Sequence, residues 1–192
     1  ARDASRFGIL KLNPLCRITN FYEKPKDPEI LKEAVTRQGS ETPYLGSMGI
    51  YLFNTDILKK MLTNYAFDDF GGNLIPAAIQ TNTVYGYSFE GYWEDIGTIR
   101  SFYDTNLLLT GDNPPFNLFD PAFPIYTHPR FLPPTTLFDA QVDNAMLTEG
   151  CCIQNAKISH SVIGLRSQIC GGVTIKDSIL MGNDYYERDW VS

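Results

Sequence analysis

The chain has 192 residues, of which 43% are hydrophobic and 20% charged, and its net charge is −6. This composition is that of a globular protein long enough to bury a core, and it excludes a disordered tail. Because the sequence has no run of basic residues and no apolar stretch near the roughly 20 residues of a membrane span, we expect neither nucleic acid nor a membrane as a partner.

The first predicted elements are a β-hairpin and a helix. Apolar residues at positions 7, 9, 10, 18 and 21 stand on both sides of a turn signal at Asn13-Pro14, which predicts two paired strands. A helix is expected over residues 27–39, because Asp27 suits the N-cap, Pro28 suits the first helical position, and Gly39 is a typical stop.

The following segments continue this alternation. Residues 49–53 predict a strand, and the next helix has Asn54 or Thr55 as its candidate cap. Helices are expected over residues 72–80 and 98–111. A pair of strand-like runs is expected between them, over residues 83–97. Strands that alternate with helices predict a layered α/β domain over residues 1–111.

A proline-rich linker is predicted over residues 112–136. This segment holds most of the chain's 12 prolines, which disfavour helix interiors and central strands. Its Phe and Tyr residues are too apolar for a free tether, so we expect the linker to lie packed across a surface.

The residues from 137 to 192 have a different period. Ile163, Ile169 and Ile175 are six residues apart, and a second row at Ser167, Val173 and Ile179 keeps the same step. Upstream, Val142, Leu147, Ile153 and Ile158 follow a looser step of five or six. A six-residue repeat is typical of a left-handed parallel β-helix, whereas short antiparallel strands are the alternative.

Cysteine and histidine usage limits the possible chemistry. The four cysteines, which we expect to be reduced, show no metal-binding spacing and are Cys16, Cys151, Cys152 and Cys170. With only His128 and His160 in the chain, a zinc site or a Ser-His-Asp triad is not favoured.

The tripeptide EKP, Glu23 to Pro25, ends the second predicted strand. Ligands of α/β proteins bind at the carboxyl ends of strands, where Glu23 would suit sugar hydroxyls and Lys24 a phosphate. A solvated surface ion pair is the other interpretation. Ser47, before the strand at 49–53, is either a ligand hydroxyl or only a strand start.

The segment WEDIG, residues 93–97, places two carboxylates in an apolar context. We expect a turn and a buried strand here, and a buried charge needs a partner. Asp95 is either a helix N-cap, a role that Thr98 fills better, or an oxygen ligand of magnesium together with phosphate oxygens.

The sequence resembles the glucose-1-phosphate adenylyltransferases, also called ADP-glucose pyrophosphorylases, over essentially its whole length. The segments that carry this resemblance are, in order, FYEKP, GSMGIYLF, DDFGGNLIP, GYWEDIGTIRSFYDTNLLLT, IYTHPRFLPPT, SHSVIGLRS and LMGNDYYE. The resemblance implies part of a nucleotide-diphospho-sugar transferase-like α/β domain, the linker, and part of a left-handed parallel β-helix.

The resemblance also implies roles for individual residues. Lys24 and Asp95 would be the catalytic residues, Asp95 as one of two aspartates that hold catalytic Mg²⁺. Glucose 1-phosphate would be bound by Gly8, Glu23, Lys24 and Ser47, with Lys24 at the phosphate. An anionic allosteric effector would be bound by Arg130, with His128 at a neighbouring position.

The activity implied by the resemblance is adenylyl transfer from ATP to glucose 1-phosphate, which yields ADP-glucose and pyrophosphate for glycogen or starch synthesis. This reaction needs positioning and charge neutralisation more than a covalent nucleophile. A homotetramer in the bacterial cytoplasm or the plastid stroma is expected for the full-length protein.

Parts of the family pattern have no counterpart in the sequence, namely the glycine-rich nucleotide loop, the second metal aspartate and the last β-helix coils. The first residues contain neither a Met nor an apolar leader. We therefore expect a fragment that is inactive by itself. The alternatives are another sugar-1-phosphate nucleotidyltransferase, a non-catalytic regulatory subunit, or a hexapeptide acyltransferase with His160 as general base.

Overall fold

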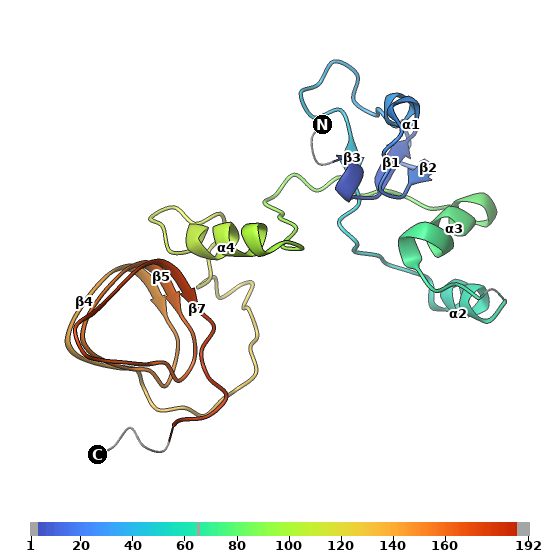
Figure 1. Cartoon of the computed structure of the whole chain (residues 1–192). Helices are drawn as coiled ribbons and strands as arrows, with labels where there is room; N and C mark the ends of the chain where they lie inside the picture. The colour runs from blue at the N-terminus through green and yellow to red at the C-terminus, as the bar shows by residue number, and fades with distance from the viewer. Residues whose placement is uncertain (1–3, 65, 188–192) are drawn as a thin grey trace. The chain divides into compact units, whose positions relative to one another are not determined.

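The computed structural model describes residues 4–64 and 66–187, and Figure 1 shows the course of the chain. The chain divides into two compact units, Ala1–Glu90 and Gly91–Ser192, and each is described by itself. Across the described residues, no helix is long and apolar enough to cross a membrane.

The first unit is built on a three-stranded antiparallel sheet in the order β2-β1-β3. These strands are β1 (Ile9–Leu12), β2 (Ile18–Tyr22) and β3 (Leu45–Gly46). The turn between β1 and β2 is fixed by the Asn13 side chain, whose Oδ1 accepts hydrogen bonds of 3.0 Å from the amides of Leu15 and Arg17. The predicted hairpin is therefore confirmed.

Helical segments accompany this sheet. They are the 3₁₀ turn η1 (Ala4–Arg6), α1 (Pro28–Glu33), α2 (Thr55–Asn64), the π-helical turn η2 (Phe70–Leu74) and α3 (Ile75–Thr81). Side-chain caps start three of them, α1, α2 and η2. Asp27 caps α1 by accepting the Glu29 amide at 2.9 Å, and Asn54 caps α2 by accepting the Asp56 amide at 3.1 Å. Both predicted caps are confirmed.

Some predicted bounds in the first unit are wrong. The first helix ends at Glu33 instead of Gly39, because the Thr36 amide leaves the helical path and donates to the Pro43 carbonyl at 3.0 Å. Residues 49–53 form no strand. Within the described part of residues 83–97, only Tyr85 forms a β-bridge, to Arg17.

The main core of the first unit lies between α2, η2, α3 and β2. Its buried members are Ile18, Met61, Leu74, Ile75, Ala78 and Ile79. Because Leu74 is completely buried and closes η2, the preceding residues 69–72 are anchored to this core. This packing holds the backbone of residues 69–72 beside the end of β2.

The second unit begins with irregular chain and helix α4 (Ile99–Leu108). Thr98 caps this helix in a capping box: its Oγ1 accepts the Ser101 amide at 3.0 Å, and Ser101 Oγ accepts the Thr98 amide at 3.2 Å. The helix packs on the coils that follow, where the Tyr103 hydroxyl donates to the Asp177 carbonyl at 2.5 Å. The predicted helix and its Thr98 cap are confirmed.

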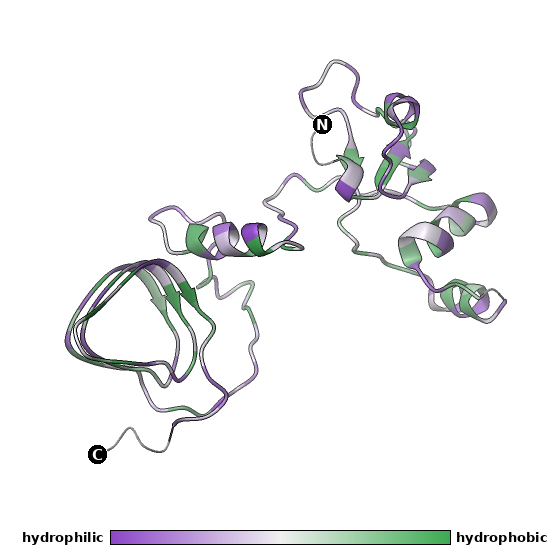
Figure 2. Ribbon diagram, viewed as in Figure 1, coloured by the Kyte–Doolittle hydropathy of each residue, from purple (hydrophilic) through white to green (hydrophobic). Residues whose placement is uncertain are grey.

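The coils form a parallel β-helix, which confirms the expected architecture for this part of the chain. Its strands are β4 (Thr136–Leu147), β5 (Cys152–Ile163), β6 (Gln168–Ile169) and β7 (Val173–Leu180). Thr136 pairs with Cys152 and Cys152 with Gln168, so each of these coils takes 16 residues. Figure 2 shows hydrophobic and hydrophilic residues interspersed along each coil.

The predicted spacing of apolar residues is seen in these coils, with a step of five between Ile153 and Ile158 and a step of six between Ile163 and Ile169. The buried rows are Cys151, Ala156, Ser161 and Ser167, and Ile153, Ile158, Ile163 and Ile169, with steps of five, five and six. Each step contains a corner residue in the left-handed region, namely Asn155 (φ 46°), His160 (φ 43°) or Arg166 (φ 58°).

The linker also differs from its prediction. Residues 112–135 contain no helix or strand, as expected, but their aromatic side chains are not packed away: Phe119, Tyr126 and Phe131 are 87%, 90% and 95% exposed. The last part of the linker does reach the first coil, where the Pro133 carbonyl accepts the Gly150 amide at 2.9 Å.

Candidate functional site

Three predicted site residues lie side by side where the strands of the first unit's sheet begin or end, a place called the sheet edge below. Gly8 precedes β1, while Glu23 and Ser47 follow β2 and β3. Because both outer strands run antiparallel to β1 and pair with Ile9 through Tyr22 and Gly46, their ends meet its beginning. The Ser47 amide donates to the Gly8 carbonyl at 2.7 Å, which holds these two residues next to each other.

The Glu23 carboxylate lies against backbone that carries no side chain. A Cβ built on Gly71 would lie 2.5 Å from Glu23 Oε2, and a Cβ built on Gly8 would lie 3.1 Å from the same oxygen. The Glu23 side chain remains 33% exposed, so its carboxylate can still accept hydrogen bonds from a ligand. Two glycines thus leave the space that this carboxylate occupies.

Lys24 occupies a strained backbone position beside Glu23. Its φ of 44° lies in the left-handed region, which costs a non-glycine residue roughly 1–2 kcal/mol. The turn is held by the Lys24 amide, which donates to the Phe7 carbonyl at 3.2 Å, and by the buried Pro25. Strain of this kind clusters at functional sites.

The Lys24 ammonium is available to a ligand. Its Nζ lies 3.4 Å from Glu23 Oε1 and its side chain is 63% exposed, so the ion pair is a solvated one that contributes little to stability. The arrangement presents one cation and one carboxylate side by side, which suits a molecule that carries both a phosphate and hydroxyl groups.

A second loop, residues 69–72, completes the site, and the sequence reasoning did not assign it. The Asp69 carboxylate caps η2 by accepting the Gly72 amide. The Phe70 ring stacks on Tyr51 with centroids 5.8 Å apart, and the Tyr51 hydroxyl lies 3.5 Å from Ser47 Oγ. The aromatic residue in GSMGIYLF and the DFG string were the available signals.

Asp95 belongs to the second unit, and the expectation of two buried carboxylates is wrong. Glu94 is exposed and Asp95 half-buried, because this segment is irregular chain and not a buried strand. A Cβ on Gly97 would lie 3.1 Å from Asp95 Oδ2, so the glycine leaves room for this carboxylate.

A magnesium role for Asp95 fits the chemistry of its oxygens. Mg²⁺ is commonly held by one or two carboxylates together with substrate phosphates, and it does not require a cage made only of protein groups. Among the described residues, no group of three or more His, Cys, Asp or Glu side chains is arranged to hold a metal. The magnesium assignment stays a prediction.

The two residues predicted to bind an effector lie in the linker. His128 and Arg130 are both exposed and flank Pro129 in irregular chain. Two basic groups of this kind can bind an anion. Their role stays a prediction.

His160 forms part of a corner ladder in the β-helix. Its Nδ1 lies 2.6 Å from Asp177 Oδ1 in the next coil, and Asn144 stands at the same corner of the previous coil. All three residues have a positive φ. The position of His160 is therefore explained by its contact with the next coil. A role as general base of an acyltransferase, which was one alternative, is not needed to explain it.

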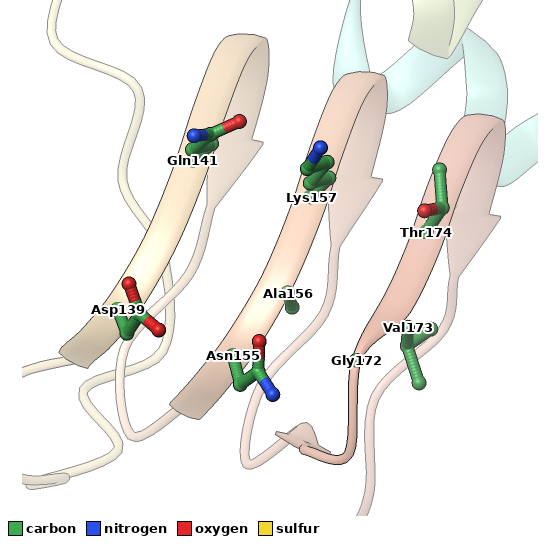
Figure 3. Close-up of a pocket in the computed structure, with 8 residues that line it drawn as sticks. All are labelled: Asp139, Gln141, Asn155, Ala156, Lys157, Gly172, Val173 and Thr174. Carbon is green, nitrogen blue, oxygen red and sulfur yellow. The ribbon is translucent and has the colours of Figure 1, made fainter.

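An open hollow of about 390 Å³ is lined by residues of the β-helix (Figure 3). Its lining consists of Asp139, Gln141, Asn155, Ala156, Lys157, Gly172, Val173 and Thr174. None of the predicted site residues contributes to it. The hollow therefore does not replace the site at the sheet edge.

Tyr22, which immediately precedes Glu23, supports the strand end. Burial and the neighbouring Glu33 carboxylate raise the pKa of Tyr22 to about 12. The phenol is therefore neutral at physiological pH. The half-buried Tyr22 packs against the cluster of Ala4, Ile9 and Ala34 and so holds the strand where Glu23 leaves it.

Comparison with known families assigns both parts of the chain. A family model for nucleotidyl transferases matches residues 1–111. A model described as the GLGC left-handed parallel beta-helix domain matches residues 130–191. The matches have the same order as the sheet with its surrounding helices and the parallel coils, and they assign the coils a left-handed sense.

Proposed function

Because the chain belongs to the nucleotidyl transferase family and continues into a GLGC-type left-handed β-helix, we propose that it serves adenylyl transfer from ATP to glucose 1-phosphate. The products are ADP-glucose and pyrophosphate, used for glycogen or starch synthesis. The observation that carries the proposal is the meeting of Gly8, Glu23 and Ser47 at one sheet edge, in a chain that resembles glucose-1-phosphate adenylyltransferases.

In this proposal the sheet edge binds glucose 1-phosphate. The Glu23 carboxylate accepts hydrogen bonds from glucose hydroxyls, while the exposed Lys24 ammonium pairs with the phosphate. The Ser47 hydroxyl adds a polar contact, and Gly8 lines the same pocket, where the absence of a side chain leaves room for the Phe21 ring and the Glu23 carboxylate. The strained turn at Lys24 keeps the two charges side by side.

The chemistry is an in-line substitution at phosphorus. A phosphate oxygen of glucose 1-phosphate attacks the α-phosphorus of ATP, the bond from that phosphorus to the β-phosphate oxygen breaks, and pyrophosphate leaves. Lys24 holds the attacking phosphate and offsets part of its charge, so the two reactants can meet. No residue of this chain has to form a covalent intermediate.

Asp95 is proposed as a magnesium ligand. Bound Mg²⁺ would neutralise charge on the phosphates of the nucleotide. The half-buried carboxylate next to Gly97 supplies the oxygen for this purpose. We further propose that His128 and Arg130 bind an anionic effector, and that the full-length protein is a homotetramer of the bacterial cytoplasm or the plastid stroma.

The choice of nucleotide separates this function from that of another sugar-1-phosphate nucleotidyltransferase. The test is to assay the full-length protein with glucose 1-phosphate, Mg²⁺ and ATP, UTP, CTP, GTP or dTTP, following the release of pyrophosphate. The expected result is the highest kcat/KM with ATP. A higher kcat/KM with any other nucleotide would overturn the adenylyl assignment, and no release with any of them would overturn the nucleotidyl transfer.

A further inference from the structure

We propose that Gly71 is a positioning residue for the Glu23 carboxylate, and that the absence of a side chain at position 71 sets the affinity of the site for glucose hydroxyls. The inference rests on the proposed sugar-phosphate role of Glu23. It adds a residue from a different segment, the η2 turn, to the residues at the sheet edge.

The Glu23 carboxylate occupies the space next to the Gly71 backbone. The three heavy atoms nearest to a Cβ built there are Glu23 Oε2 at 2.5 Å, Cδ at 3.0 Å and Oε1 at 3.5 Å. The whole carboxylate therefore faces the Gly71 backbone. Since φ of Gly71 lies outside the left-handed region, an alanine would fit the backbone conformation, and only the carboxylate would be in its way.

The backbone on both sides of this contact is anchored. Asp69 caps the turn before Gly71, Phe70 stacks on Tyr51, and the completely buried Leu74 follows. On the other side, β2 ends at Tyr22, and the Lys24 amide is bonded to the Phe7 carbonyl. An added methyl group is therefore relieved by rotation of the flexible Glu23 side chain, with little effect on the fold.

The consequence is specific for hydroxyl recognition. In Gly71→Ala the carboxylate leaves its position and loses a charge-assisted hydrogen bond, which corresponds to a loss of about 10-fold or more in affinity for glucose 1-phosphate. Binding of the phosphate alone depends on Lys24, whose side chain is 63% exposed and is not among the three atoms nearest to a Cβ on Gly71. Inorganic phosphate should therefore bind the variant as it binds the wild type.

The test measures the binding of glucose 1-phosphate and of inorganic phosphate to the 192-residue chain by titration calorimetry. Four variants are compared: Gly71→Ala, Glu23→Asp, the double variant, and Gly46→Ala as the control, where a Cβ would meet only Phe7 Cβ at 3.9 Å. Because aspartate is shorter by one methylene, it avoids the alanine methyl group. The loss in the double variant should be smaller than the product of the two single losses.

The outcomes separate the inference from the function on which it rests. Unchanged glucose 1-phosphate affinity in Gly71→Ala, or an equal loss for inorganic phosphate, would overturn the positioning role. If the wild type binds no glucose 1-phosphate, the proposed function fails, and the ¹³C resonance of the Glu23 carboxyl carbon decides the positioning role. A shift of this resonance in Gly71→Ala, absent in Gly46→Ala, supports the role, and an unchanged resonance overturns it.

Discussion

The Ser47 amide donates a 2.7 Å hydrogen bond to the Gly8 carbonyl and so joins the end of one edge strand to the start of the central strand. Glu23 leaves the other edge strand on the far side of Gly8, with its carboxylate 3.1 Å from the position of a Gly8 Cβ. Three separate segments thus present a hydroxyl, a carboxylate and bare backbone within one small region. The proposed sugar-phosphate site rests on this arrangement.

Replacing Lys24 should affect one substrate selectively. In the full-length protein, Lys24→Ala removes the charge that faces the sugar phosphate, so KM for glucose 1-phosphate should rise by about 10-fold or more while KM for ATP changes far less. The measurement is steady-state kinetics with each substrate varied in turn. Lys26→Ala, which removes an exposed lysine two residues away, is the matched control. Equal effects of Lys24→Ala on both substrates would contradict the role.

Replacing Asp95 should lower turnover and leave substrate binding largely unchanged. Asp95→Asn keeps the size of the side chain but weakens it as a magnesium ligand, so kcat should fall by about 100-fold at saturating substrates, with a partial recovery at raised Mg²⁺. The comparison is Glu94→Gln, an exposed neighbour whose kcat should remain near that of the wild type. A kcat of Asp95→Asn that equals that of Glu94→Gln would argue against a metal ligand.

Tyr22 should make the first unit less stable at alkaline pH. Because its folded-state pKa is raised to about 12 from 10, its contribution is complete below pH 10 and is lost as pH rises through 12. Relative to Tyr22→Phe, which cannot ionise, the wild type should lose thermal stability between pH 9 and about 12. Thermal unfolding followed by circular dichroism at several pH values measures this difference.

The control for that experiment is Tyr87→Phe, whose ring is 90% exposed in the same unit. Its difference in Tm from the wild type should be the same at every pH, because its environment changes little on unfolding. A wild-type curve parallel to that of Tyr22→Phe across the alkaline range would show that burial does not perturb the Tyr22 phenol.

The buried row of the β-helix should determine the stability of the second unit. Ile158 is only 2% exposed and is level with Val142 and Ile175 in adjacent coils. Ile158→Ala creates a cavity and should lower the free energy of unfolding by about 2–5 kcal/mol. Val142→Ala, at a site that is 38% exposed, should cost clearly less. Denaturant unfolding of both variants gives the comparison, and equal losses would contradict the assigned core.

Local signals in the sequence predicted the parts of the fold that local physics determines. Asp27 and Thr98 were recognised as caps, and the second helix cap was narrowed to Asn54 or Thr55, since a cap depends on a few neighbouring residues. The strand predicted at residues 49–53 depends on a partner strand elsewhere in the chain, which no local pattern reveals. The strand-like runs predicted over most of residues 83–97 also depend on partner strands elsewhere in the chain.

The β-helix was predictable from the spacing of its aliphatic residues. Ile163 and Ile169 keep the predicted step of six, and Ile153 and Ile158 keep the looser step predicted upstream. The left-handed corners at Asn155, His160 and Arg166 were not predicted, because the conformation of a corner is not visible in hydropathy.

The candidate site was partly predictable for related reasons. Glu23 and Lys24 follow the end of β2, as the sequence indicates, whereas Ser47 was expected before a strand at residues 49–53 and instead follows β3. Gly71 comes from a separate loop, and its relevance depends on a distance of 2.5 Å between its missing Cβ and Glu23 Oε2. Only packing in three dimensions brings that loop to the strand end.

The central claim is that the edge formed by Gly8, Glu23 and Ser47 binds glucose 1-phosphate. The most direct measurement is titration of the isotopically labelled 192-residue chain with glucose 1-phosphate, followed by amide NMR, with glucose 6-phosphate as the reference ligand. The account predicts saturable shifts that are centred on residues 8, 23, 24, 47 and 71 and larger for glucose 1-phosphate. Shifts confined to other residues, or identical shifts with both ligands, would contradict it.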